Sequence, residues 1–160
     1  MRAVVTRVTW ARVSIEGHQV GACGPGLLVL VAAAKGDSDV EARRLADRVL
    51  GLRIFGDEAG KMNLALADLP PSTEPQILVI SNFTLYGDAW SSRRPSFMRA
   101  AGFEDGNALY DAFVAALRER GLAVATGEFG GDMKVESLND GPVTLIIDAD
   151  PPDNNPEPRS

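Results

Sequence analysis

The chain has 160 residues and a net charge of −6, from 16 basic and 22 acidic side chains. Its composition, 45% hydrophobic and 24% charged, is typical of one soluble globular domain and excludes a disordered chain, a collagen or a coiled coil. The longest apolar run, Leu27–Ala34, is far shorter than the roughly 20 residues that span a bilayer. The negative charge argues against a protein that coats nucleic acid, but it leaves room for a small basic patch that meets one end of an RNA.

The first part of the chain predicts strands joined by turns. Ala3–Val8 and Val13–Glu16 have the composition and alternation of half-buried strands. Turn-forming residues follow at Glu16–Gln19 and at Gly24–Gly26. The continuous apolar run Leu27–Ala34 predicts a strand in the middle of a sheet, covered on both faces.

Two helices are predicted further along. One follows the capping residues 37–39, and its apolar stripe consists of Leu45, Val49 and Leu52. Gly51 leaves the last turn of that helix open. The other helix is expected from about Asn107 to Arg120, where Gly121 stops it.

The remaining segments predict a fold of the α+β or α/β class. Further strands are expected at Arg53–Phe55, Gln76–Ile80, Leu122–Thr126, Lys134–Leu138 and Val143–Ile147. Residues 86–102 lack a period and predict a long loop. We expect one domain over residues 1–149, with a mixed sheet and two main helices packed on it. The proline-rich residues 150–160 predict a disordered tail.

Familiar catalytic and metal-binding groups are scarce in the sequence. His18 is the only histidine and follows a glycine in a predicted turn, which favours an exposed turn residue over a member of a catalytic triad. Cys23 is the only cysteine, so neither an intrachain disulfide nor a zinc site is expected. Because residues 1–10 show no signal-peptide pattern, the expected location is the cytoplasm.

Two segments have compositions that suggest a site. In Ser81–Leu85, small polar groups follow an apolar strand, a usual place for a ligand, where backbone N–H groups can point at an oxyanion. The same polar groups could instead satisfy only the local backbone. Asn139–Thr144 contains Asn-Asp-Gly-Pro, which is first of all a turn signal between two strands. A rigid Gly-Pro could also present backbone carbonyls to something small.

At these two segments the chain resembles the D-aminoacyl-tRNA deacylases. That family has the signature Ser-Gln-Phe-Thr-Leu, matched by Ser81–Leu85 with Asn82 in place of glutamine, and the signature Asn-x-Gly-Pro-Val-Thr, matched in full by Asn139–Thr144. The similarity runs in order from Met1 to about Ile147. Further similar stretches are Arg7-Val8, Arg48–Gly51, Arg53–Phe55, Gly60–Asn63, Arg94–Phe97, Ala108–Tyr110 and Gly127–Met133.

The resemblance implies a homodimer with a barrel-like fold and an active site at the subunit interface. The implied reaction is hydrolysis of the ester between a D-amino acid, or mischarged glycine, and the 3′-terminal adenosine of tRNA. The implied partners are the 3′ end of aminoacyl-tRNA and a second copy of the chain, but no DNA and no membrane. Neither a metal nor another cofactor is expected.

The resemblance also assigns roles to individual residues. Phe83 and Thr84 match the catalytic acyl-binding segment. The substrate-binding positions are Arg7, Ser81, Asn82, Phe129 and Met133. Gly141 and Pro142, joined by a cis bond in the family, are expected to reach into the partner's site and exclude L side chains, with Arg7 holding that turn in place.

The mechanism and two competing functions stay open at this point. Thr84 is either a nucleophile or a positioning group while the ribose 2′-hydroxyl helps to activate water. No histidine or lysine stands near it in sequence, so we favour the second idea. A binder of RNA ends without activity, or a structural dimer whose Gly141-Pro142 turn only packs, would share some of these features.

Overall fold

The computed structural model describes residues 1–70, 72 and 76–149. The predicted tail, residues 150–160, lies outside the described residues. In chain order the elements are β1 (Arg2–Ile15), β2 (His18–Cys23), β3 (Gly26–Ala32), α1 (Asp39–Leu50), β4 (Phe55–Gly56), β5 (Met62–Leu64), the 3-10 turn η1 (Leu66–Asp68), β6 (Ile77–Ser81), the 3-10 turn η2 (Phe83–Tyr86), α2 (Phe103–Arg118), β7 (Val124–Thr126) and β8 (Lys134–Asp148).

The main sheet has six strands and is mixed, as predicted. Its order is β2-β1-β3-β6-β7, with β8 paired to β1. The β3–β6 and β6–β7 pairs are parallel and the others antiparallel. The two ends of this order approach each other at Gly21 of β2, where a Cβ atom would collide with the carbonyl oxygen of Thr126 in β7. The sheet therefore curls into a nearly closed barrel.

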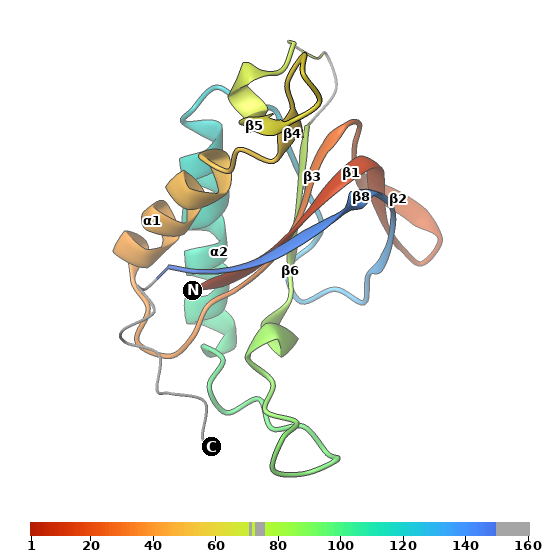
Figure 1. Ribbon diagram of the computed structural model, residues 1–160. Coiled ribbons are helices and arrows are strands. Elements are labelled where there is room, and N and C mark those ends of the chain that lie inside the picture. Colours follow the sequence, from red (N-terminus) through yellow and green to blue (C-terminus); the bar gives the residue numbers. More distant parts are fainter. Residues whose placement is uncertain (71, 73–75, 150–160) are drawn as a thin grey trace.

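Both helices cover one face of the sheet (Figure 1). The main core lies between the helices and the sheet. It includes Leu45, Phe113, Leu117, Val29 and Ile77, all almost fully buried. A second apolar cluster, around Val13, Leu28, Leu78 and Ile80, lies on the inner side of the curled sheet. The run Leu27–Ala34 is thus covered on both faces, as its composition predicted. No helix of the described residues is long and apolar enough to cross a membrane.

The first helix begins where it was predicted but ends at Leu50, so Leu52 of the predicted stripe lies beyond it. The second helix begins earlier than expected. Ser38 caps α1, with a capping box to Glu41. The second helix, α2, starts at Phe103 rather than near Asn107. Gly106 lies inside this helix and next to the Phe129 ring, which an added Cβ would approach at 3.4 Å.

The prediction of a turn between two strands at Asn139–Thr144 was wrong. Figure 1 shows β1 and β8 running side by side as long continuous strands. Their register shifts on both sides of Val8, opposite Asn139, so the Asn-Asp-Gly-Pro segment bulges out of β8 without reversing the chain. The long partner strand keeps both halves of β8 in one ladder. In the same way, the two strands predicted within residues 3–16 form one strand.

Candidate active site

A cavity of about 910 Å3 opens where the parallel strands β3 and β6 end. Five of the residues predicted for the site line it, and they come from β6, η2 and the connection between β7 and β8: Ser81, Asn82, Phe83, Phe129 and Met133. Segments more than 40 residues apart in sequence are therefore brought together as one candidate site. Thr84, Arg7, Gly141 and Pro142 are not part of the lining.

Asn82 shapes the segment that follows β6. Its backbone N–H donates to the Val31 oxygen at 2.8 Å, which extends the sheet by one bond. Its side-chain oxygen accepts hydrogen bonds from both the N–H and the hydroxyl of Thr84. Asparagine is suited to this cap of a neighbouring turn because its amide reaches the N–H two residues ahead. The asparagine side chain at this position thus has a clear local role.

Phe83 forms one side of the cavity mouth. Its side chain is 58% exposed and contacts Phe97 edge to face, with ring centroids 5.1 Å apart. Gly87 makes room for this pair, since a Cβ there would lie 2.9 Å from the Phe97 ring. Phe83 is also the first residue of η2, so its N–H has no acceptor within that turn.

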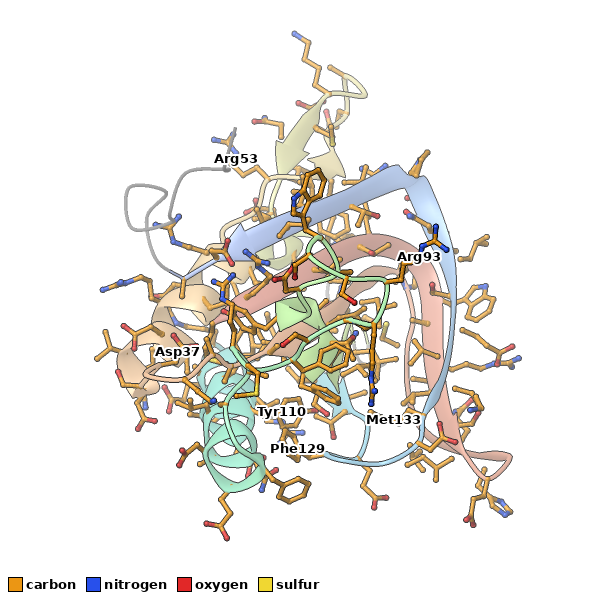
Figure 2. The ribbon with its side chains drawn as sticks, turned by 90° about the horizontal axis from the view of Figure 1, so that it is seen from below. Asp37, Arg53, Arg93, Tyr110, Phe129 and Met133 are labelled. Carbon is orange, nitrogen blue, oxygen red and sulfur yellow. The ribbon has the colours of Figure 1, made fainter. Side chains whose placement is uncertain are left out.

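Aromatic rings form another wall of the cavity. Phe129 lies between Phe103 and Tyr110, with ring centroids 5.2 and 5.7 Å away. Figure 2 shows Tyr110, Phe129 and Met133 in the same region, seen from below. The Tyr110 hydroxyl donates to the Val79 oxygen at 3.0 Å, and burial raises the pKa of Tyr110 to about 12. The tyrosine is therefore neutral at physiological pH and anchors α2 to β6.

Gly141 and Pro142 form a second group with Arg7, apart from the cavity lining. Their peptide bond is cis, and both residues are exposed on β8. The Arg7 guanidinium donates to the Asp140 carbonyl at 3.0 Å and also to the Ile54 carbonyl. The Asn139 side chain accepts from the Val143 N–H at 3.2 Å. The bulge is thus held from two sides within a single chain.

Two residues that the sequence set aside are indeed in ordinary positions. His18 is the exposed first residue of β2. Cys23 is buried, and this burial raises the pKa of its thiol to about 11. Within the described part of the chain, no three His, Cys, Asp or Glu side chains are grouped so that they could hold a metal ion.

The sequence missed three aromatic residues of the site. Phe97 supports the cavity mouth, while Phe103 and Tyr110 enclose Phe129. Tyr110 was named within the family-like stretch Ala108–Tyr110 and was given no role in the site. Phe103 is 70% exposed at the start of the second helix. The two acidic residues that follow it are typical of a first helical turn and could have placed the helix start at Phe103.

Comparison with known proteins identifies the family. The sequence pattern of the D-Tyr-tRNA(Tyr) deacylase family matches residues 4–148. A protein of Heliobacterium modesticaldum named D-aminoacyl-tRNA deacylase is 51% identical over 148 residues, 92% of this chain and 96% of its own length. One of Thermotoga petrophila with the same name is 51% identical over 149 residues, 93% of this chain and 97% of its own. This chain belongs to the D-Tyr-tRNA(Tyr) deacylase family.

Solved structures agree with the family fold. The c-Myc DNA Unwinding Element Binding Protein is 34% identical, with a TM-score of 0.84 over 92% of this chain and 98% of its own. A probable eukaryotic D-amino acid tRNA deacylase, 19% identical with a TM-score of 0.77, shares the fold. Family membership confirms the resemblance seen in the sequence and makes this chain a hydrolase of the deacylase type.

Few titratable side chains line the cavity in which the family's hydrolysis would take place. The described lining of the cavity contains no histidine, lysine or cysteine. Its carboxylate, Asp132, is exposed and paired with Lys134 at 3.0 Å. What the cavity offers is apolar and aromatic surface together with backbone N–H groups. Such a site suits binding and polarising an ester more than direct attack on it.

Proposed function

We propose that this chain hydrolyses the ester that joins a D-amino acid, or mischarged glycine, to the 3′-terminal adenosine of tRNA in the cytoplasm. The proposal depends chiefly on the cavity at the end of β6, in which the Ser81–Phe83 segment faces Phe129 and Met133. A strand end next to an apolar wall can hold an acyl group at one side and a nucleoside at the other.

In this proposal the Phe83 N–H stabilises the oxyanion of the tetrahedral intermediate. The N–H groups of Asn82 and Thr84 already have acceptors, in Val31 and in the Asn82 side chain. Phe83 begins the 3-10 turn and has a backbone donor to offer. Removal of one such donor costs roughly 3–4 kcal/mol in other enzymes.

Thr84 positions the acyl-binding turn and does not attack the ester. Its hydroxyl is exposed and donates a hydrogen bond to the amide oxygen of Asn82. An amide oxygen is too weak a base to remove that proton, so the nucleophile is water. Water adds to the carbonyl carbon, the bond to the ribose 3′ oxygen breaks, and that oxygen takes up a proton, with the neighbouring 2′-hydroxyl assisting.

Phe129 and Met133 provide a surface for the terminal adenosine. Aromatic rings bind bases by stacking, and a thioether adapts to an irregular apolar surface. Phe129 is held in place by Phe103 and Tyr110. The nucleoside would therefore meet a wall whose orientation is set before it binds.

The proposed assembly is a homodimer formed through β8. Within the described residues this strand pairs only with β1. Along it, four apolar side chains are between 37% and 71% exposed: Val135, Leu138, Leu145 and Ile146. An edge strand with exposed apolar side chains is a surface that proteins usually cover.

The dimer would also supply the chiral filter. Gly141 and Pro142 are exposed on the same strand as these apolar side chains and lie outside their own chain's cavity lining. We assign them to the partner's cavity, where their carbonyls occupy the space that an L side chain needs. Glycine has no side chain and would pass this filter, which accounts for its inclusion as a substrate.

The function is tested by release of amino acid from purified D-tyrosyl-tRNA and glycyl-tRNA, followed at low enzyme concentration. We expect free D-tyrosine and free glycine, together with intact tRNA. A folded, dimeric protein that binds tRNA but releases no amino acid would overturn the proposal and favour a non-catalytic binder of RNA ends.

A further inference from the structure

The loop between η2 and α2 is an ordered structure in its own right. Asp88 and Ser96 exchange two backbone hydrogen bonds of 2.8 and 2.9 Å, which close the loop at its base. The Asp88 carboxylate also accepts from the Trp90 N–H at 3.0 Å, a bond that lowers the pKa of Asp88. The Ser92 hydroxyl accepts from the Arg94 N–H at 3.1 Å. Residues 88–96 therefore present their side chains from a fixed frame.

This loop presents an aromatic ring and two arginines to the outside. Trp90 is 96% exposed, the highest value among the large apolar side chains that the structure describes as exposed. Arg93 and Arg94 are exposed, and in the described part of the chain neither guanidinium has an ion pair or a hydrogen bond. A fully exposed tryptophan beside two unpaired cations indicates a surface that binds a partner molecule.

Three surface arginines elsewhere in this acidic chain are paired with carboxylates. Arg12 pairs with Glu136, Arg43 with Glu119 and Arg120 with Asp47. Residues 87–99, in contrast, contain three arginines and one acidic residue, in a chain whose net charge is −6. The loop is thus a local basic surface, and its charge is complementary to an anion.

The loop is joined to the candidate active site. Phe97, near the base of the loop, contacts Phe83 at the cavity mouth with ring centroids 5.1 Å apart. Figure 1 shows the green segment after β6 extending away from the sheet, and Figure 2, seen from below, shows the loop with Arg93 in the foreground. A nucleic-acid strand that leaves the cavity past Phe83 would meet this loop next.

We propose that residues 88–96 bind the single-stranded nucleotides that precede the terminal adenosine of the RNA substrate. Trp90 stacks on a base, and Arg93 and Arg94 contact phosphates. This combination of an aromatic ring with arginines is how proteins hold single strands without reading their sequence. The inference depends on the proposed function for the identity of the strand. It adds a binding surface that lies outside the cavity and takes no part in the reaction itself.

The kinetic test compares two substrates. Trp90→Ala, and the double variant Arg93→Ala with Arg94→Ala, should each raise KM for D-tyrosyl-tRNA roughly tenfold, with kcat little changed. Neither should alter hydrolysis of 3′-D-tyrosyl-adenosine, which has no preceding nucleotides. The control is Arg43→Ala with Arg120→Ala, which removes the same charge from the helical face. An equal effect of the loop variant and the control on KM, or an equal effect on both substrates, would overturn the inference.

A binding test keeps this inference separate from the proposed function. The chain has two tryptophans, so Trp10→Phe leaves Trp90 as the only one. Uncharged tRNA should quench the emission of Trp90 in this variant. Loss of Arg93 and Arg94 should reduce the slope of log K against log salt by about 1.4, the value for two phosphates of a single strand. Unchanged emission in the presence of bound tRNA would contradict the stacking, whether or not the protein is a deacylase.

Discussion

The hydroxyl of Thr84 donates a hydrogen bond to the side-chain oxygen of Asn82, the same oxygen that accepts the Thr84 N–H. Threonine and asparagine thus form a closed local pair at the start of η2. This pairing gives Thr84 a structural reason to be present, and it gives Asn82 a reason to be asparagine. It also means that a reacting hydroxyl would first have to break its bond to Asn82.

Thr84→Val should therefore keep most of the single-turnover rate, because the turn retains the bond from the Thr84 N–H to Asn82. We expect a loss of less than about tenfold, near the net value of one hydrogen bond. The measurement is single-turnover release of D-tyrosine with enzyme in excess. Complete loss of release with tRNA binding intact would contradict the positioning role of Thr84.

Gly141→Ala should weaken the discrimination between D- and L-aminoacyl groups. Gly141 has φ +137°, and an added Cβ would lie 2.8 Å from the Val143 nitrogen and 3.2 Å from the Arg7 guanidinium. The bulge must shift, so its carbonyls move from the places that we assign to them. The measurement is the ratio of release rates from D- and L-tyrosyl-tRNA, which we expect to fall at least tenfold through a slower D rate, a faster L rate or both.

Gly17→Ala is the matched control for that variant. Gly17 also has a positive φ, +81°, but nothing lies within 4 Å of its added Cβ, and it belongs to the turn between β1 and β2. It carries the same kind of backbone strain without the contact to Arg7. An equal change in the D-to-L ratio in both variants would contradict the role given to Gly141.

Ile146→Asp should dissociate the proposed dimer. Ile146 is 71% exposed in the single chain and lies on β8, so a charge there would be buried without a partner in the assembly. Sedimentation equilibrium should show a dimer for the unchanged protein and a monomer for the variant. Activity should fall with the dimer. Val40→Asp, on the exposed side of α1 at 57% exposure, should change neither property.

Because of Tyr110, part of the free energy of unfolding depends on pH in the alkaline range. Its pKa is raised by burial to about 12, whereas a tyrosine in the unfolded chain loses its proton near pH 10. The folded state then holds the proton more tightly, so this contribution is complete below about pH 10 and is lost as the pH rises towards 12.

Tyr110→Phe tests this relation by urea unfolding. The variant should be less stable by about 1 kcal/mol near neutral pH, because the bond to the Val79 carbonyl is lost. The difference in the free energy of unfolding between the two proteins should become smaller above about pH 10. A difference that stays constant over this range would contradict the protonation argument. Tyr86 and Cys23, whose pKa values burial also raises, are common to both proteins and cancel in the comparison.

Local chemistry was enough to predict much of this fold. The capping residues before α1 and the apolar run of β3 specify their elements through nearby sequence alone. Long-range pairing was not predictable in this way. Asn139–Thr144 has the composition of a turn, and only the pairing of β8 with β1 on both sides of this segment makes it a bulge. The start of α2 at Phe103, four residues before the predicted start, was likewise not predictable from the local pattern, because Phe103 packs against Phe129, 26 residues along the chain.

The residues of the candidate site also divide into those that local sequence predicts and those that depend on long-range packing. Ser81, Asn82 and Phe83 were singled out because a polar segment after a buried strand is locally unusual. The resemblance to a family added Phe129 and Met133, which composition alone would have assigned to the core. Tyr110 and Phe103 were missed because their roles arise from packing against Phe129.

The most direct test of the central claim is a comparison of matched D- and L-tyrosyl-tRNA with the unchanged protein. Release of free tyrosine is followed over time at equal substrate concentrations, with spontaneous hydrolysis subtracted. The account predicts rapid release of D-tyrosine and release of L-tyrosine no faster than the spontaneous rate. Equal release of both enantiomers by the intact dimer would contradict the chiral filter at Gly141 and Pro142, and release of neither would contradict the deacylase itself.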